Sequence, residues 1–445
     1  MGSSVACQRY LQRHIEPGLP DLHLQHPRWQ QVLVVPAYRE SATLLHRLAK
    51  LPANGGTHLV ILVLNRPDSD PDPHANDALR EALAALPPSA STASPACRQV
   101  NPHLELYVHD MDALDGPLPA AQGVGLARKT GCDLAFKWIS QGAIDSAWIC
   151  SGDADALLPP DYFSQLDAVP AGAPAAVFPF VHVAGDDCDC NAATALYELR
   201  LHHYVLGLEF AHSPCAWHSL GSCLAVRATH YAQVRGFPKR AGGEDFYLLD
   251  KLGKLGPISR LAGHCIELQS RHSDRAPFGT GPAVAKISAA PDMMQLTLFY
   301  HPACFQALGH VLEVIPGLYA GDAPALHELL AMQGQAAEQA AISCAILEEM
   351  GLAKALEHCR RQGKTRAQFL RQFHQWFDAL RTLKFIHGLR DAGWPMQSLQ
   401  QLQHLQPQLW PAVTAWEIPQ LRNSAATHWG WELPPTSPAR GYHPG

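Results

Sequence analysis

Apolar runs alternate with helix-like segments between residues 31 and 151, and this alternation limits the folds open to the chain. The apolar runs are QVLVVPA (31–37), HLVILVL (58–64), HLELYVH (103–109) and AWICS (147–151). Continuous runs of this kind are typical of strands buried on both faces of a sheet. The segments between them are long enough to cross over from one parallel strand to the next. The sequence therefore predicts an α/β fold with a mostly parallel sheet flanked by helices.

The character of the chain changes after Pro291. Segments such as ALHELLAMQGQAAEQAAISCAILEEM (325–350) and TRAQFLRQFHQWFDALRTLKFIHGL (365–389) carry apolar residues at helical spacing, and no later run is typical of a strand. We therefore expect a smaller all-α domain after the sheet domain. The predicted division is an N-terminal extension at 1–29, the α/β domain at 30–288, the helical domain at 289–433 and a flexible tail at 434–445.

Composition argues against several classes of protein. The formal net charge of −6 and the lack of a long basic run give no support for a nucleic-acid partner. No apolar stretch reaches the length of roughly 18 residues that a membrane span needs, and the N-terminus lacks the order of a secretory signal. The twelve cysteines include no CxxC pair, which is typical of reduced thiols. We expect a soluble, cytoplasmic protein, and the sequence leaves its oligomeric state open.

Polar residues gather directly after the predicted strands and in one later segment. These segments are PAYRES (36–41), NRPDSD (65–70), SGDAD (151–155) and GGEDFYLL (242–249). Ligands of open α/β sheets bind beyond the carboxyl ends of the strands, so these segments form the candidate site. Each one alone is also compatible with ordinary turn chemistry or, for Glu244 and Asp245, with the start of a helix.

Asp153 and Asp155 are the most informative of these residues. They stand one residue apart at the end of a hydrophobic strand, in the stretch AWICSGDADALLPPDYF. Carboxylates crowded in this way repel each other unless a cation, a hydrogen-bond network or solvent offsets the repulsion. The pair therefore indicates either a cation site or a solvated turn.

Four motifs in order give the chain a resemblance to a known family. They are VVPAYRES, GVGLARKTG, DADALLPPDYF and GSCLAVRATHYAQVRGFPKRAGGEDFYLLDKLGKLG, within residues 31–281. In this order they resemble the motifs of family 2 glycosyltransferases of the GT-A fold. The resemblance implies a GT-A type sheet and an enzyme of the hexosyltransferase class. Such an enzyme would move a sugar from a UDP- or GDP-sugar to a hydroxyl acceptor.

The resemblance also implies roles for the carboxylates and for one histidine. Asp153 and Asp155 correspond to the Asp-x-Asp pair that binds Mn²⁺ or Mg²⁺, with Asp155 as the direct ligand and Asp153 reaching either the metal or the ribose. His272 is expected to complete the metal shell, and His264 is the weaker candidate. Asp245 corresponds to the base of an inverting displacement, with Glu244 beside it to position the acceptor or the base.

The remaining candidates are expected to hold the nucleotide and its phosphates. The nucleotide end is assigned to Pro36, Tyr38, Glu40, Asn65, Asp68 and Arg128. Arg271 and Arg275 lie in the basic, glycine-containing segment 270–281, which suits a loop that closes over phosphates. The chain departs from the family pattern at Asn65, where two aspartates are common, and at Lys129, where asparagine is usual.

Three other functions stay open at this point. The arrangement of Arg271, Ser273 and Arg275 also resembles loops of retaining transferases that make glycosylated glycerates, which would make the product a small glycosylated metabolite. A nucleotidyltransferase would usually show a glycine-rich basic loop after the first strand, and PAYRES is no such loop. A non-catalytic nucleotide-binding or scaffold protein would not need the intact Asp153 and Asp245. The sequence does not identify the acceptor.

Overall fold

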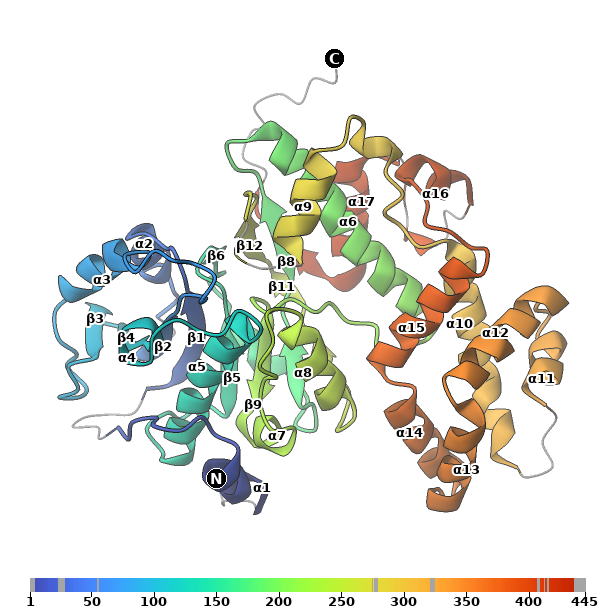
Figure 1. The fold of residues 1–445 in the computed structure, drawn as a ribbon, viewed down its shortest axis with the longest axis horizontal. Helices are drawn as coiled ribbons and strands as arrows, with labels where there is room; N and C mark the ends of the chain where they lie inside the picture. Colours follow the sequence, from blue (N-terminus) through green and yellow to red (C-terminus); the bar gives the residue numbers. More distant parts are fainter. Residues whose placement is uncertain are drawn as a thin grey trace.

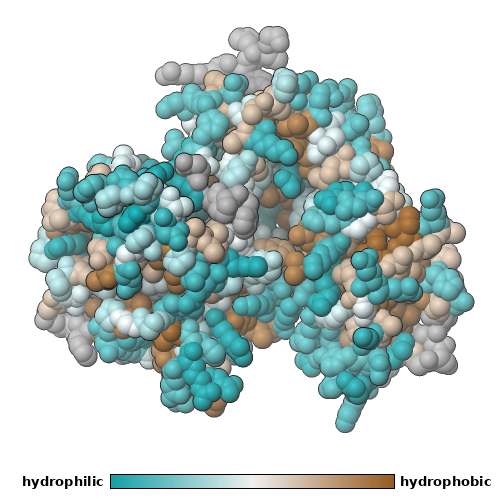
Figure 2. Space-filling view, in the orientation of Figure 1, coloured by the Kyte–Doolittle hydropathy of each residue, from teal (hydrophilic) through white to brown (hydrophobic). Residues whose placement is uncertain are grey.

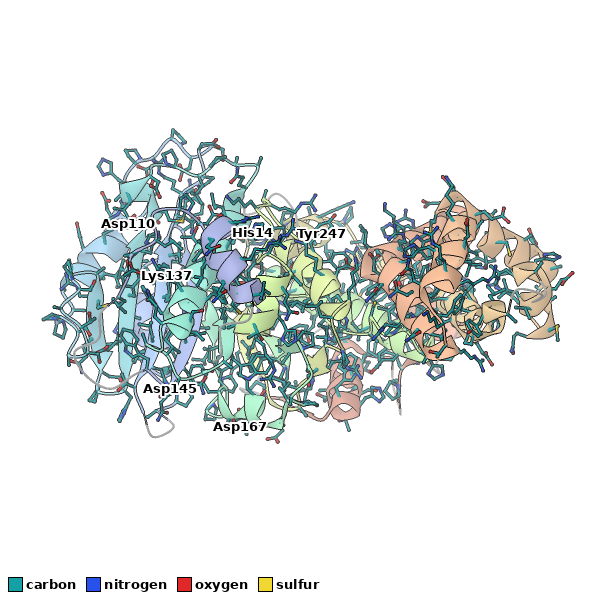
Figure 3. The ribbon with its side chains drawn as sticks, turned by 90° about the horizontal axis from the view of Figure 1, so that it is seen from below. His14, Asp110, Lys137, Asp145, Asp167 and Tyr247 are labelled. Carbon is teal, nitrogen blue, oxygen red and sulfur yellow. The ribbon has the colours of Figure 1, made fainter. Side chains whose placement is uncertain are left out.

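The computed structural model describes residues 5–22, 29–53, 56–273, 275, 279–320, 325–405, 409–411, 413 and 416–435. A sheet with its flanking helices occupies one end of the molecule, and the later helices occupy the other end (Figure 1). Seen from below, Lys137 lies beside the strands of the large sheet, and Tyr247 lies between the two ends (Figure 3). Within the described ranges, no helix combines the length and the apolar character that crossing a membrane requires.

The large sheet has eight strands in the order β10-β7-β9-β5-β1-β2-β4-β3. Its strands are β1 (Gln31–Ala37), β2 (His58–Leu64), β3 (Cys97–Asn101), β4 (Leu104–Asp110), β5 (Trp148–Ser151), β7 (Ala175–Val177), β9 (Leu224–Arg227) and β10 (Ser259–Arg260). The central strands β5, β1, β2 and β4 run parallel, whereas β3 and β9 pair antiparallel with their neighbours. The predicted α/β class with a mostly parallel sheet is confirmed.

The predicted apolar runs form β1, β2, β4 and β5, and the sequence analysis missed the edge strand β3. The segment CRQVN of β3 buries only its first residue, Cys97. A strand at the edge of a sheet, with most of its side chains partly exposed, needs no continuous apolar run. Hydrophobic pattern alone therefore does not reveal it.

Helices flank the large sheet, and the chain also forms two smaller sheets. The helices before residue 290 are α1 (Val5–Arg13), α2 (Thr43–Leu48), α3 (Asp77–Ala84), α4 (Met111–Leu114), α5 (Gly123–Ser140), α6 (Cys188–Phe210), α7 (Ala228–Gln233), α8 (Glu244–Gly253) and α9 (Thr280–Ser288), with the 3₁₀ turn η1 (Ser164–Ala168). A three-stranded sheet joins β6 (Ala156–Leu157), β12 (Ile266–Gln269) and β8 (Phe180–Val183). A two-stranded sheet pairs β11 (Gly263–His264) with β13 (Trp431–Glu432).

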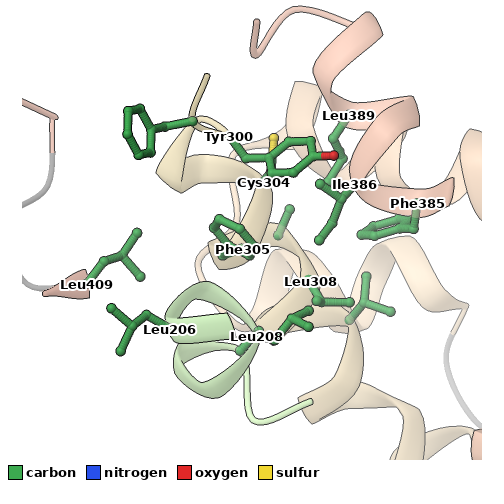
Figure 4. Close-up of a cluster of buried hydrophobic side chains, with 14 of the residues drawn as sticks. Leu206, Leu208, Tyr300, Cys304, Phe305, Leu308, Phe385, Ile386, Leu389 and Leu409 are labelled. Atoms are coloured by element: carbon green, nitrogen blue, oxygen red, sulfur yellow. The ribbon is translucent and has the colours of Figure 1, made fainter. Parts of the chain in front are cut away.

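The chain after residue 290 is helical, as predicted, apart from the two-residue strand β13. Its elements are η2 (Met293–Gln295), α10 (Pro302–Val314), η3 (Ile315–Tyr319), α11 (Leu326–Met332), α12 (Ala337–Glu349), α13 (Leu352–Gln362), α14 (Arg366–Trp376), α15 (Ala379–Asp391), α16 (Leu399–Leu405) and α17 (Ile418–Trp429). Leu206 of α6, Phe305 of α10 and Ile386 of α15 belong to one buried cluster (Figure 4). Because α6 and α9 share this core with the later helices, the domain boundary at 288/289 stays a prediction.

A buried polar network attaches the N-terminal helix to the sheet domain. The Lys129 ammonium donates to Asp133 Oδ2 at 2.7 Å, to the Tyr10 hydroxyl at 2.9 Å and to the His14 carbonyl at 2.9 Å. The Tyr10 hydroxyl in turn donates to Asp133 Oδ1 at 2.5 Å. Lys129 therefore docks residues 5–16 against α5, which gives the departure from the family pattern at this position a structural reason.

All twelve cysteines are free in the structure. Most of them are buried, and burial raises the pKa of Cys150 and of Cys97 to about 12. These thiols stay protonated near neutral pH and behave as small apolar side chains.

Candidate functional site

A cavity of about 500 Å³ opens at the carboxyl ends of the central strands. Figure 2 shows the surface hollowed between the sheet domain and the helices above it. Eleven of the thirteen predicted site residues line this cavity: Pro36, Tyr38, Glu40, Asn65, Arg128, Asp153, Asp155, Glu244, Asp245, Arg271 and Arg275. The parallel strands end near one another, since Ala37 of β1 pairs with Leu64 of β2. The residues that follow these strands therefore reach one edge of the sheet.

Arg128 of α5 organises the carboxylates on the floor of the cavity. Its buried guanidinium donates to Asp153 Oδ1 at 2.8 Å and to Glu244 Oε1 at 3.1 Å. It also donates to Ser151 Oγ at 2.7 Å, at the end of β5. A Cβ at Gly221 would lie 2.6 Å from the guanidinium, so only glycine allows this close approach. Arg128 thus joins two predicted site carboxylates, and its assignment to the nucleotide stays a prediction.

Asp155 and Glu40 face the arginines of the 270–281 segment. Arg271 Nε donates to Asp155 Oδ2 at 2.8 Å, and Nη2 lies 2.7 Å from the same oxygen in an ion pair. The same guanidinium lies 3.8 Å from Glu40 Oε1, and Arg275 also donates to that carboxylate. Two acidic and two basic side chains therefore balance one another across the mouth of the cavity, and a bound diphosphate or cation would rearrange these ion pairs.

Asp245 stands at the first turn of α8, directly after Glu244. Gly243 precedes the helix with φ +66°, a left-handed conformation that glycine adopts without strain. The Asp245 carboxylate accepts a hydrogen bond from the Phe246 amide at 2.7 Å. Burial and the adjacent Glu244 carboxylate raise the pKa of Asp245 to about 7. A carboxylate with this pKa can accept a proton at neutral pH, which is what a general base requires.

The end of the cavity near β1 and β2 is lined largely by uncharged residues. The Tyr38 hydroxyl donates to Asp70 Oδ2 at 2.6 Å, which orients the ring. The Asn65 amide donates to the Ala37 carbonyl at 3.1 Å, so its donors are used by the ends of the strands. Apolar lining residues here are Pro36, Pro67, Leu118 and Val124. This end suits a flat ring, such as a nucleobase, better than it suits a charged group.

Two predicted site residues do not line the cavity. Asp68 Oδ1 accepts a hydrogen bond from the Ala120 amide at 2.9 Å and so joins the loop after β2 to the loop before α5. His272 Nε2 lies 3.2 Å from Asp187 Oδ2, on an exposed part of the surface. The weaker candidate His264 contacts Asp161 at 3.1 Å. The assignments of Asp68 to the nucleotide and of His272 to a metal stay predictions.

The donor set at the cavity fits a divalent cation bound mainly by oxygen. In the described ranges, no group of three His, Cys, Asp or Glu side chains is placed to hold a metal. Asp153 and Asp155 are partly exposed, at 40% and 24% of their side chains. Mg²⁺ commonly takes one or two carboxylates, completes its shell with water and substrate phosphates, and needs no all-protein cage. Asp153 and Asp155 are compatible with that mode.

The sequence analysis missed one wall of the cavity. His182 of β8, Tyr197 and Leu201 of α6, Leu220 and Phe246 line it. Phe246 follows Asp245 in the GGEDFYLL segment, and the other four residues belong to no recognisable motif. Tyr197 and Leu201 are one helical turn apart on α6, which is a spacing equally typical of core residues. Only their position beside Asp245 in the folded chain distinguishes them.

No protein-family model matches the sequence, and no curated protein matches it either. Among solved structures, the fold is similar to that of S. aureus TarS 1–349 in complex with UDP-GlcNAc, with 13% sequence identity and a TM-score of 0.36. That match covers 82% of this chain and 92% of the TarS chain. The same fragment in complex with UDP gives 13% identity and a TM-score of 0.34, over 82% and 93% of the two chains. At these TM-scores the likeness is distant and carries no conclusion about ligands of this chain.

Proposed function

We propose that this chain is a metal-dependent glycosyltransferase that moves a sugar from a nucleotide-sugar donor to a hydroxyl acceptor, with inversion at the anomeric carbon. One observation carries the proposal. The Asp245 carboxylate, whose pKa is raised to about 7, shares a cavity with the pair Asp153 and Asp155 and with two arginines. A base, a candidate cation site and phosphate-binding groups are the three parts that this reaction needs.

The donor would lie along the strand ends. Its nucleobase would enter the apolar end of the cavity between Pro36 and Leu118, with Tyr38 held beside it by Asp70. Its diphosphate would lie where Arg271 and Arg275 now contact carboxylates. Guanidinium groups bind phosphate oxygens in a bidentate manner, so these arginines can exchange one anion for another.

Asp153 and Asp155 would hold Mn²⁺ or Mg²⁺. When bound there, the cation would supply positive charge next to the diphosphate leaving group, where negative charge develops in the transition state. Arg128 keeps the Asp153 carboxylate oriented through its 2.8 Å hydrogen bond. Because the buried Arg128 guanidinium is bonded to both Asp153 and Glu244, we assign it to positioning these carboxylates.

The chemical step then requires one base. The acceptor hydroxyl transfers its proton to the Asp245 carboxylate while its oxygen forms a bond to the anomeric carbon. The bond between that carbon and the β-phosphate oxygen breaks, and the nucleoside diphosphate leaves with the electron pair. Glu244 stays paired with Arg128, and its negative charge helps to keep the pKa of Asp245 high enough for proton uptake.

A melting experiment tests the proposal without an acceptor. UDP or GDP with Mn²⁺ should raise the melting temperature, because a ligand at 100 times its Kd stabilises the native state by about 2.7 kcal/mol. AMP with Mn²⁺ serves as the matched nucleotide control. A screen of UDP- and GDP-sugars for slow hydrolysis, read from released nucleotide, should then identify the donor. If neither nucleotide changes the melting temperature and no donor is hydrolysed, the proposal is wrong.

A further inference from the structure

The cavity wall formed by His182, Tyr197, Leu201, Leu220 and Phe246 is mostly apolar, unlike the part of the lining that carries the arginines. Tyr197 is buried, and the other apolar members are half-buried. Leu201, Leu220 and Phe246 also line a smaller adjoining cavity of about 50 Å³. Asp245 is next to Phe246 in the chain and acts on the Tyr197 hydroxyl electrostatically, so the wall lies beside the proposed base. We call these five residues the α6 wall.

None of the five residues of the α6 wall is an arginine or a lysine. Among the described lining residues, the cationic side chains are Arg128, Arg271 and Arg275, and each of them contacts a carboxylate. Asp245, next to Phe246, adds negative charge beside the wall. At His182 the Glu198 carboxylate is paired with Arg422. An anionic acceptor placed beside Asp245 would meet like charge.

His182 is held in one orientation by a buried carboxylate. Glu198 of α6 accepts hydrogen bonds from the His182 amide at 2.6 Å and from His182 Nδ1 at 2.8 Å. Arg422 of α17 donates to the same carboxylate at 2.6 Å and to the His182 carbonyl at 2.7 Å. The orientation of the His182 imidazole at the cavity therefore depends on contacts between β8, α6 and α17.

The charge state of Glu198 decides which nitrogen of His182 carries the proton. Burial raises the pKa of the Glu198 carboxyl, but Arg422 and the nearby histidines outweigh burial and hold that pKa well below its usual value. An ionised carboxylate only accepts hydrogen bonds, so His182 Nδ1 must donate. In the neutral tautomer of His182 that donates through Nδ1, Nε2 carries no proton and can accept a hydrogen bond at the cavity.

We propose that the α6 wall binds the acceptor, that the acceptor is an uncharged hydroxyl compound with an apolar ring face, such as a glycoside, and that His182 Nε2 accepts a hydrogen bond from it. This inference rests on the proposed function, since it places the acceptor beside Asp245. A sugar or aryl ring presents C–H or π surfaces to Tyr197 and Phe246 and hydroxyl groups to His182. One such ligand would contact both the apolar surface of the wall and the hydrogen-bond acceptor of His182.

A matched pair of probes tests the chemical class. p-Nitrophenyl β-D-glucoside and p-nitrophenyl β-D-glucuronide differ by one carboxylate on the same ring. With the enzyme saturated with UDP and Mg²⁺, which is diamagnetic, saturation-transfer NMR should show binding of the glucoside at least tenfold tighter than binding of the glucuronide. Equal or tighter binding of the glucuronide would overturn the inference.

A conservative substitution tests the role of His182. In His182→Asn, the amide nitrogen takes the place of Nδ1 and can still donate to Glu198, while the acceptor at Nε2 is lost. We expect the glucoside to bind about tenfold more weakly, as one lost hydrogen bond implies, with unchanged UDP affinity and melting temperature. Unchanged glucoside affinity would contradict the inference.

The control is the same substitution at His203, a buried histidine of α6 whose Nε2 contacts the Tyr300 carbonyl at 2.8 Å in the helical core. His203→Asn should lower the melting temperature and leave glucoside affinity unchanged.

The two proposals can fail separately. If UDP does not bind the wild-type protein, the proposed function is wrong; if UDP binds and the glucoside does not, only the acceptor inference is wrong.

Discussion

The Arg271 guanidinium contacts Asp155 through two nitrogens, which lie 2.8 and 2.7 Å from the same carboxylate oxygen. A side chain proposed to bind phosphate therefore holds a side chain proposed to bind a cation. When the donor complex binds, this ion pair must separate. The cation would then bind Asp155, and the diphosphate would bind Arg271. The cost of breaking the pair is part of the cost of donor binding.

Arg271→Ala should consequently change cation and nucleotide affinity in opposite directions. Freeing Asp155 should tighten the binding of Mn²⁺ alone, because the carboxylate no longer exchanges an arginine for the metal. Loss of the guanidinium should weaken UDP binding in the presence of Mn²⁺ about tenfold or more, as expected for a charged hydrogen bond. Calorimetric titration measures both affinities. A parallel decrease of the two would contradict competition for Asp155.

Asp155→Ala should abolish the Mn²⁺ dependence of nucleotide binding and leave the fold intact. Asp155 is partly exposed, so its removal opens no core cavity. Asp161→Ala is the control, because Asp161 is a neighbouring acidic residue that contacts His264 and Gln165 outside the cavity. Fluorescence titration of UDP with and without Mn²⁺ gives the readout. Normal metal dependence in Asp155→Ala would show that the carboxylate has another role.

Asp245→Asn should reduce the transfer rate by roughly 10²- to 10⁴-fold, the usual contribution of a general base. The amide preserves the shape of the side chain and cannot take up the proton of the acceptor. Affinity for UDP and Mn²⁺ should stay near that of the wild type, so the loss falls on kcat. The measurement is transfer kinetics beside nucleotide titration. A near-normal rate would exclude an inverting base at this position and favour the retaining alternative.

The transfer rate should rise with pH through about 7 and then level, since Asp245 acts only when ionised.

The stability of the protein should follow the opposite trend. An acid whose pKa is raised on folding contributes stability below its unfolded pKa and loses that contribution as pH rises through the folded pKa. Asp245→Asn, which stays neutral, should therefore gain stability relative to the wild type between pH 5 and pH 8. Urea unfolding at both pH values is the test.

Lys129→Asn should destabilise the protein by about 3 kcal/mol, because Asp133 would lose its buried cationic partner. The double variant Lys129→Asn with Asp133→Asn should recover part of that loss. Hydrogen exchange should increase in residues 5–16, which this network docks, while UDP affinity stays unchanged. Equal exchange in all three proteins would show that the network does not hold the N-terminal segment.

The sequence predicted the parts of the site that follow from local pattern. Apolar runs long enough to be buried on both faces identified β1, β2, β4 and β5, and polar residues directly after such strands had to meet at one edge. Local pattern did not identify His182, which is an isolated histidine within the apolar segment FVHV. It also did not show that His272 lies against Asp187, away from the cavity lining.

The amino-acid sequence alone determined the class of fold, the order of the strands along the chain and the acidic character of their ends. Tertiary structure decided the chemistry of these groups. The near-neutral pKa of Asp245 depends on burial and on Glu244, and the orientation of His182 depends on Arg422, a residue 224 positions beyond Glu198. The strength of charge interactions depends on distance and on exclusion of water, and both arise only when segments distant in the chain are packed together.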